Sequence, residues 1–427
     1  MNINRAKPLS SSYNRTEQYF LNAAFLTLFP GFFFYHTALG TGATGAFLGG
    51  YFSPVSLFFA LPLAAILLRH YKRTYRRISA LEIYANIFLI YFFIVIIINS
   101  MAGANRAIIT NHLLCILFGI NAFIVFNIID FSSSVFRASS LVAIMAMSVI
   151  AFSYSVNGVF YLGALGVAKD ADSLATYQGF ARSYLVTVLP LVAFTHSLLL
   201  RILLYGMAVA TLFVNTARSE FAALLFVIPI IELYFSQRKI LFLVSTMLIC
   251  IWLNMHLDQL ISALPDNRIL ELLDLSHSTS ANKRQHLNAH ALNTVIAHPF
   301  LGDYASYAPG HYAHNILSAW VDLGLFGFIY IIAILVAPSI PMFFREYFSG
   351  QKNGSFILSF TLMCSTSLLL ATSHYFTDML IGATLGVYVQ YQNERKYGKH
   401  RTSDFSPSAS RYPNFYKTMS QHGQERP

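Results

Sequence analysis

Long apolar runs, separated by short polar or basic connections, follow one another along almost the whole chain. A transmembrane helix needs about 20 mostly apolar residues to cross roughly 30 Å of hydrocarbon. Such runs occur at 19–38, 46–68, 82–99, 108–129, 139–157, 183–200, 202–215, 221–235, 240–256, 314–336, 356–373 and 376–392. The pattern predicts about twelve membrane-spanning helices, of which the shortest, 202–215, is expected to be tilted or broken.

The composition supports this interpretation and excludes two other classes of protein. Of the 427 residues, 56% are hydrophobic and only 11% are charged, and the mean hydropathy is +0.55. Soluble globular domains carry about 25% charged residues, and disordered chains combine low hydrophobicity with high charge. We therefore expect an all-α, polytopic membrane protein with about 12 transmembrane helices.

The distribution of basic residues predicts the orientation in the membrane. Cytoplasmic loops of membrane proteins carry an excess of Lys and Arg. With the N-terminus in the cytoplasm, 21 of the 28 Lys and Arg residues lie on the cytoplasmic side and 7 on the outer side. Both termini are thus predicted to be cytoplasmic. The net charge of +10 then reflects topology and contact with membrane lipid, and no nucleic-acid partner is expected.

Two segments differ from the spans. Residues 393–427 are polar and have no apolar period, which predicts a disordered cytoplasmic tail after a membrane domain of residues 1–392. Residues 257–313 form one large outer loop between the ninth and tenth spans. Within this loop, Pro265–Leu275 predicts an interfacial amphipathic helix, and Asn282–Ala297 predicts a second helix.

Three basic side chains are predicted to meet at the outer membrane face. Arg218 lies in a tight connection between two spans, Arg284 opens the second loop helix, and His314 begins the tenth span. The chain crosses the membrane twice between the two arginines, so both lie on the same side. Because guanidinium groups bind phosphate oxygens with paired donors, this group suits a phosphorylated, membrane-bound substrate.

Each of these residues also has a simpler interpretation. Arg218 can reach lipid headgroups, Arg284 can lie on a solvated helix face, and His314 can cap a span. Arg182 can likewise anchor the end of a span. Asp322 lies eight residues after His314, about two turns deeper on roughly the same face, and can orient the site or a neighbouring helix.

No metal site is expected. His286 and His290 lie one turn apart, but Leu287 stands where a zinc-protease helix carries Glu, and no third ligand is evident. The three cysteines lie in separate apolar runs, which is typical of small buried hydrophobic residues.

The run ANKRQHLNAHALNTVIAHPFLGDYASYAPGHYAHNILSAWVDLGLFGF resembles the central signature of the O-antigen polymerase and ligase superfamily. That signature has an Arg opening a periplasmic helix, an (Asn or His)-Pro-hydrophobic-hydrophobic-Gly turn, and a His-Asn pair entering a span. The matching residues are Arg284, the turn His298–Gly302, His314, Asn315, Leu317, Gly324 and Gly327. Asp322 stands where the family usually has Glu. The segment TARSEFAALL resembles an upstream family segment and supplies Arg218.

The resemblance implies a glycosyltransferase of a bacterial inner (plasma) membrane with its active site on the periplasmic face. Such an enzyme polymerises undecaprenyl-diphosphate-linked repeat units of O-antigen or a related surface polysaccharide, with no metal and no other cofactor. Arg218 and Arg284 would bind the diphosphate and stabilise the leaving group, and His314 would take the proton of the attacking hydroxyl. The expected substrate-binding residues are Arg182, Asn315, Asp322 and Tyr312.

The resemblance also implies the partners: a carrier-linked glycan donor and acceptor, with a chain-length regulator and a flippase as further candidates. Two alternatives stay open. An O-antigen ligase would use the same chemistry to transfer glycan to the lipid A core. A flippase or transporter of the lipid-linked glycan would carry inverted repeats and charges buried at the midplane, whereas the charged candidates here gather at one face, which favours an enzyme.

Overall fold

The computed structural model describes residues 14–46, 50–74, 78–168, 174, 177–257, 259, 261, 269, 279–308, 311–349 and 352–404. Within these ranges the chain is helical, without strands apart from one isolated bridge between Val156 and Val159. Residues Met1–Tyr391 form one compact unit, and Gln392–Pro427 form a second. The predicted all-α class is confirmed for the described part.

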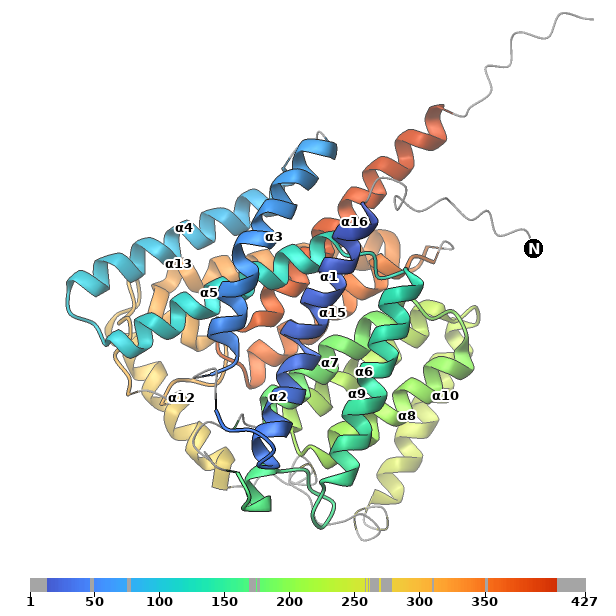
Figure 1. Ribbon diagram of the computed structural model, residues 1–427, viewed down its shortest axis with the longest axis horizontal. Coiled ribbons are helices and arrows are strands. Elements are labelled where there is room, and N and C mark those ends of the chain that lie inside the picture. Colours follow the sequence, from blue (N-terminus) through green and yellow to red (C-terminus); the bar gives the residue numbers. More distant parts are fainter. Residues whose placement is uncertain are drawn as a thin grey trace, which may run out of the picture. The chain divides into compact units, whose positions relative to one another are not determined.

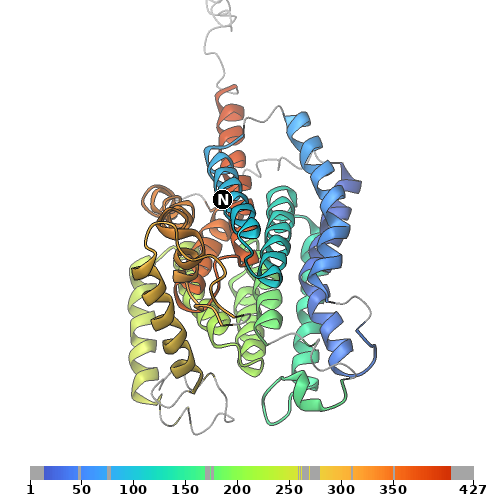
Figure 2. The same cartoon turned by 90° about the vertical axis from the view of Figure 1, so that its left-hand side faces the viewer.

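The longer helices follow the predicted apolar runs, except for α12, which lies in the predicted outer loop. They are α1 (Arg15–Leu28), α2 (Pro30–Gly40), α3 (Phe52–Thr74), α4 (Ala80–Met101), α5 (Arg106–Ile128), α6 (Ser134–Ser153), α7 (Tyr177–Ala193), α8 (Leu198–Val214), α9 (Arg218–Phe235), α10 (Lys239–Met255), α12 (Thr279–Ala297), α13 (Leu317–Val336), α15 (Gly354–Thr372) and α16 (Met379–Asp404). Shorter elements are η2 (Leu162–Leu165), α14 (Ser339–Met342) and the π-helical η5 (Phe343–Tyr347). Figures 1 and 2 show their arrangement.

Seven helical segments of the described chain are long and apolar enough to cross a membrane. They are Arg15–Gly40, Phe52–Arg73, Ala80–Met101, Arg106–Ile128, Ser134–Ser153, Leu317–Tyr347 and Gly354–Thr372. Two shorter apolar helices are α8 and α10. The protein is therefore a multi-pass helical protein of membrane type, and the number of twelve spans stays a prediction.

Several helix boundaries differ from the sequence pattern. The first predicted span is divided into α1 and α2 at Pro30, which has no N–H to donate to the preceding turn. The run 183–200 is helical from Tyr177 to Ala193, so Arg182 lies inside α7 and not before it. Ser197 then accepts a hydrogen bond from the Leu200 N–H and starts α8.

The predicted outer loop and tail are only partly described. The second loop helix is present as α12, which begins at Thr279 and ends at Ala297, two residues before Pro299. The first, Pro265–Leu275, lies outside the described residues except for Ile269. At the other end, α16 continues to Asp404, well beyond the predicted boundary at 392, because Gln, Glu, Arg and Lys readily extend an existing helix. Residues 405–427 lie outside the described part.

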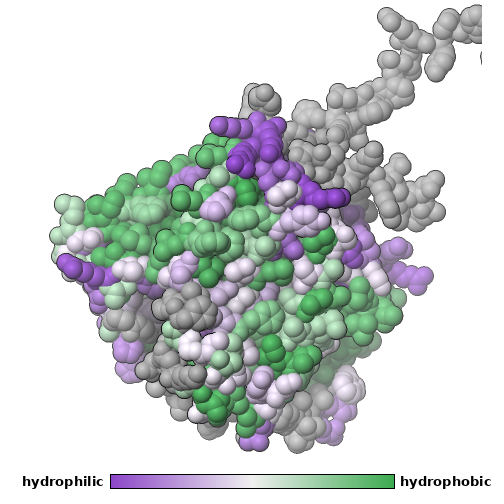
Figure 3. Space-filling view, viewed as in Figure 1, coloured by the Kyte–Doolittle hydropathy of each residue, from purple (hydrophilic) through white to green (hydrophobic). Residues whose placement is uncertain are grey.

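The interior and the outer surface of the larger unit are both apolar. In α7, every residue from Phe180 to Ala193 except Arg182 is buried, whereas α10 buries none of its residues. Figure 3 shows apolar side chains over α3 and α4, with hydrophilic residues grouped at the end of α3, where Arg69, Lys72 and Arg73 lie. A wide apolar surface with a charged end is what a bilayer requires.

A buried ion pair lies between α8 and α9. The Nε and Nη2 groups of Arg201 donate to the two carboxylate oxygens of Glu232 at 2.6 and 2.8 Å, and Tyr205 donates to Oε1. Arg201 is buried although the sequence pattern places it in a cytoplasmic loop. This bidentate pair ties the start of one helix to the end of the next.

The turn from His298 to Gly302 packs against an interruption in α13. Gly324 has φ +67° inside that helix, and the Leu325 N–H contacts the carbonyls of Pro299 and Phe300. A Cβ at Gly302 would lie 2.3 Å from the Val321 oxygen. Because neither glycine has a side chain, the backbone of the turn can contact the backbone of α13. This contact fixes the path of the loop that follows the turn.

Close backbone contact also positions the segment between α15 and α16. Gly382 and Gly386 form a small-xxx-small pattern on α16. A Cβ at Gly382 would lie 2.0 Å from the Gly119 carbonyl of α5, and one at Gly386 would lie 2.5 Å from the Phe123 carbonyl. Small residues allow such helix approach in membranes, so the preceding loop is held against α5.

Candidate functional site

A cavity of about 690 Å³ lies where α2, α3, α5 and α7 meet two loops, 303–316 and 373–378. Its polar lining includes Arg182, Tyr312, His314, His374 and Asp378. Three of these residues, Arg182, Tyr312 and His314, belong to the site predicted from sequence. Ligand cavities of proteins typically measure about 300–1,000 Å³.

Another part of the cavity wall is aromatic and apolar. The Phe32 and Phe52 rings are stacked with centroids 4.3 Å apart, and Phe52 packs edge-on against Phe118 at 4.7 Å. Leu114 adds to the same lining. The cavity therefore combines an apolar wall with a charged group, as a ligand with a hydrophobic and an ionic part would need.

Four ionisable side chains from α7, α9 and the 373–378 loop form a cluster at the cavity. The Arg182 Nη1 donates to Asp378 Oδ2 at 2.7 Å. The His374 ring places Nδ1 2.9 Å from the same oxygen and Nε2 3.1 Å from Glu220 Oε1. Glu220 and His374 are almost fully buried. Nε2 makes a hydrogen-bond contact with Glu220, whereas Nδ1 lies close to Asp378 without hydrogen-bond geometry. Two carboxylates beside one ring favour the doubly protonated imidazolium.

Electrostatics in the cluster favour the ionised forms. Burial alone would lower the pKa of His374, but Asp378 and Glu220 outweigh it and raise this pKa to about 9. Burial alone would raise the pKa of Asp378, whereas Arg182 and His374 hold it well below its usual range. Two cations and two anions balance each other, so the cluster is a fixed neutral framework and His374 is not a base near neutral pH.

Arg182 nevertheless keeps a donor for a ligand. Its Nε is buried, has no hydrogen-bond partner among the described residues, and lies 3.8 Å from Glu220 Oε1. Buried donors are normally paired. The Arg182 side chain stays 25% exposed at the cavity, where the guanidinium group can meet an oxygen atom of a ligand.

His314 has the opposite electrostatic environment. Its ring lies 4.6 Å from the Tyr312 ring. Burial lowers the pKa of His314, and the positive charges of Arg284 and His374 lower it further. The imidazole is therefore neutral at pH 7 and able to accept a proton. Arg284 on α12 lies near enough to act electrostatically on both His314 and Tyr312, although Arg284 is not in the cavity lining.

Arg218 begins α9 and does not line the cavity either. The position of Arg218 in space is nevertheless fixed, because Glu220, in the same helical turn, belongs to the buried cluster. The preceding turn is held by Asn215, whose side chain donates to the Tyr177 carbonyl. Thr216 there adopts φ +60°, which is unusual for a β-branched residue.

Asp322 is entirely buried behind the cavity wall. Its Oδ1 accepts from the Ala305 N–H at 2.9 Å, and its Oδ2 accepts from the Tyr307 and Tyr375 hydroxyls. Tyr375 also contacts His112 Nε2 at 2.8 Å. This placement gives Asp322 the role of positioning two tyrosines, which agrees with the orienting role expected from the sequence; its contact with a ligand stays a prediction.

Asn315 also has a structural position. Its Oδ1 accepts from the Leu317 N–H, and its Nδ2 donates to Asn288 on α12. His314 precedes α13 and does not lie in it, so the predicted alignment of His314 and Asp322 on one helical face is replaced by a bent loop.

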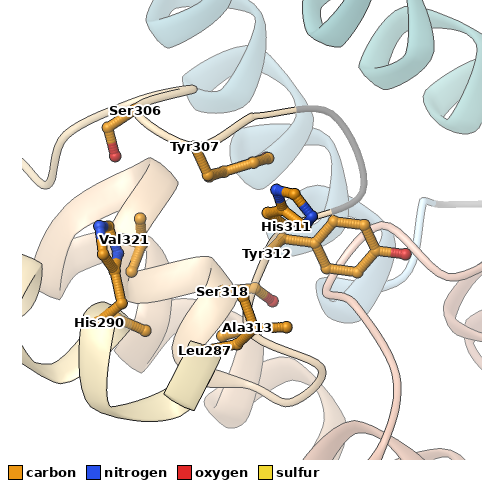
Figure 4. Close-up of a pocket in the computed structure, with 10 residues that line it drawn as sticks. Leu287, His290, Ser306, Tyr307, His311, Tyr312, Ala313, Ser318 and Val321 are labelled. Atoms are coloured by element: carbon orange, nitrogen blue, oxygen red, sulfur yellow. The ribbon is translucent and has the colours of Figure 1, made fainter. Parts of the chain in front are cut away.

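A second, much smaller cavity of about 10 Å³ adjoins the first through Tyr307 and Tyr312. Figure 4 shows its lining, with His290 on α12 opposite His311 on the loop. The volume suits about one water molecule. Among the described side chains, no group of three or more His, Cys, Asp or Glu is arranged to hold a metal ion.

Sequence reasoning did not select His374, Glu220, His112 or Tyr375 for the site. His374 and Asp378 stand four residues apart in a chain with few charges, and ionisable residues in such a setting are often functional. Glu220 follows Arg218 by two residues. Tyr375 has no comparable pattern in the sequence that would have indicated a functional role.

No known protein family, curated protein or solved structure matches this chain.

Proposed function

We propose that this protein is a membrane glycosyltransferase that uses a donor sugar linked to a lipid diphosphate, and that it polymerises glycan repeat units. The observation that carries the proposal is the combination in one cavity of an aromatic wall, a partly unsatisfied Arg182 and a neutral His314, with Arg284 close by. The aromatic wall suits an isoprenoid chain, and the charge of Arg284 together with the N–H donors of Arg182 suits its diphosphate.

The proposed reaction needs one base and stabilisation of one leaving group. The acceptor hydroxyl oxygen attacks the anomeric carbon of the donor and forms the new glycosidic bond. The bond from that carbon to the diphosphate oxygen breaks, and its electron pair stays on the diphosphate. His314 Nδ1 or Nε2 takes the hydroxyl proton, which a neutral imidazole can do.

The arginines have different tasks in this proposal. Arg182 is anchored by Asp378, which fixes the position of its guanidinium group at the cavity wall. Arg284 makes no salt bridge to a carboxylate in the described part of the chain, which leaves its charge for the diphosphate. The role of Arg218 in binding the same group stays a prediction from the resemblance.

The framework around these residues is preorganised. The cluster of Arg182, Asp378, His374 and Glu220 joins α7, α9 and the 373–378 loop, while Asp322 fixes the loop that carries His314. Preorganised charges need little rearrangement when the leaving group develops its charge, which is the main source of electrostatic catalysis.

The test uses the purified full chain in nanodiscs with an undecaprenyl-diphosphate-linked oligosaccharide as both donor and acceptor. We expect longer lipid-linked glycans on a gel from the wild type, and at least a 100-fold lower rate from His314→Ala and Arg284→Ala, since loss of a base or an oxyanion donor costs about this much. His286→Ala, an exposed change on the same helix as Arg284, is the matched control.

The outcome also separates the alternatives. Transfer only to an added lipid A core acceptor would mark a ligase, and flipping without chain extension would mark a transporter. Equal product from the wild type and the His314→Ala protein would refute the proposed role of His314.

A further inference from the structure

A second group of cations lies where the end of α9, the start of α10 and the segment before α15 meet. Lys352 Nζ lies 4.3 Å from the centre of the Tyr234 ring. Lys239 Nζ lies 5.0 Å from the Phe348 ring and 5.6 Å from the Tyr347 ring. Both ammonium groups therefore lie within range of cation–π attraction.

The rings beneath the two lysines are in contact with each other. The Tyr234 and Tyr347 centroids are 5.7 Å apart, and those of Tyr347 and Phe348 are 5.1 Å apart. Tyr347 is itself fixed, because its hydroxyl donates to the Ile230 carbonyl of α9. The three packed rings thus form one aromatic surface, and both lysines lie on it.

The positive charges of the two lysines on this aromatic surface are incompletely compensated by hydrogen-bond acceptors or carboxylates. Lys239 Nζ is inaccessible to solvent and donates no hydrogen bond within the described residues. Among the described residues, Lys352 donates only a long contact of 3.5 Å, to the Ser349 carbonyl. Burial lowers the pKa of Lys352, and the neighbouring Lys239 charge lowers it further. Glu346 has contacts of its own and acts electrostatically on Tyr234. Among the described residues it makes no salt bridge to either lysine.

Two ammonium groups that act electrostatically on each other, one of them with an unmet donor, favour a nearby anion. A buried ammonium without a partner is costly, and phosphate oxygens accept charge-assisted hydrogen bonds from Lys. The surface next to the lysines is apolar: Ile240 is 80% exposed and Phe344 is 76% exposed. An anion with a hydrocarbon tail matches both features, whereas a soluble phosphate matches only one.

We propose that Lys239 and Lys352 form a binding site for the phosphate headgroup of an anionic phospholipid, whose acyl chains cover Ile240 and Phe344. The basic residues of the chain predict that this end faces the cytoplasm, where anionic lipids of the inner leaflet attract Lys and Arg. The site lies apart from the cavity and does not depend on the proposed glycosyl transfer.

The test measures binding of phosphatidylglycerol to the full-length protein in a neutral detergent, by thermal melting and by native mass spectrometry. We expect phosphatidylglycerol to raise the melting temperature by several degrees, with phosphatidylcholine giving little change. Lys239→Gln/Lys352→Gln should bind phosphatidylglycerol at least 10-fold more weakly. Lys72→Gln, which changes an exposed lysine at the end of α3, should bind like the wild type.

Three results would overturn the proposal. These are equal stabilisation of the wild type by both lipids, equal stabilisation by inorganic phosphate alone, and unchanged affinity in the double variant. If the double variant does not fold, the single Lys352→Gln protein replaces it, because Lys352 lies in a loop and its loss is expected to weaken binding by a smaller but measurable factor.

Discussion

Replacing His374 by Gln tests the electrostatics of the buried cluster directly. The glutamine side chain would keep most of the volume of the ring but would carry no charge between Glu220 and Asp378. The wild-type imidazolium interacts with both carboxylates at 3.1 and 2.9 Å. Its removal leaves Arg182 as the single cation beside two buried anions, so we expect His374→Gln to lower the stability of the folded protein.

The magnitude follows from the pKa of His374. The rise from the ordinary value of 6.5 to about 9 corresponds, at 1.36 kcal/mol per pKa unit, to about 3 kcal/mol. Because the folded-state pKa is above the unfolded value, this contribution is complete below pH 6.5 and is lost as the pH rises through 9. The melting temperatures of wild type and variant should therefore differ most at pH 6 and converge near pH 9.5.

The assay is thermal unfolding in detergent between pH 6 and 9.5, followed by the fluorescence of Trp252 and Trp320. Subtracting the melting temperature of the variant from that of the wild type at each pH removes the contributions of groups that titrate in both proteins. A control is His286→Gln, an exposed change on α12 that should follow the wild-type curve at every pH. A constant difference between the wild type and His374→Gln across this range would refute the assignment of a buried imidazolium.

Four further predictions concern the loop and the base. Gly302→Ala should lower the free energy of unfolding by about 1–3 kcal/mol, because the residue has φ +72° and its Cβ would meet a carbonyl of α13. The control is Gly206→Ala in a helix, where the added Cβ has open space and should be neutral or stabilising. Equal melting temperatures of the two variants would contradict the docking of the turn. Asp322→Asn should lower stability by about 1–3 kcal/mol and reduce activity, since it deprives two buried tyrosine hydroxyls of an acceptor; an unchanged melting temperature would exclude this role. The pKa of His314 lies below 6.5, so the rate should be constant from pH 7 up to the range in which His374 loses its proton, at about 9, and should fall on acidification. Arg284→Gln removes a nearby positive charge and should move this acidic limb to higher pH in the residual activity; a shift to lower pH would count against His314 as the base.

The sequence alone determined the class of the protein and most helix positions. Apolar runs of about 20 residues have few alternatives to a helix in a membrane, because backbone N–H and C=O groups must be satisfied within the segment. The sequence also selected Arg182, Tyr312 and His314, which line the cavity. Charged and polar residues are rare in this chain, so their positions carry information.

The tertiary structure decided which side chains meet and what each one does. The sequence aligned His314 and Asp322 on one helix, but the contact of the His298–Gly302 turn with Gly324 and the loop after it separates their roles. His374 and Glu220 lie 154 positions apart, and only the packing of α9 against α15 brings them together. Ion pairing, burial and the resulting pKa of a histidine depend on such long-range contacts, which no local pattern of residues encodes.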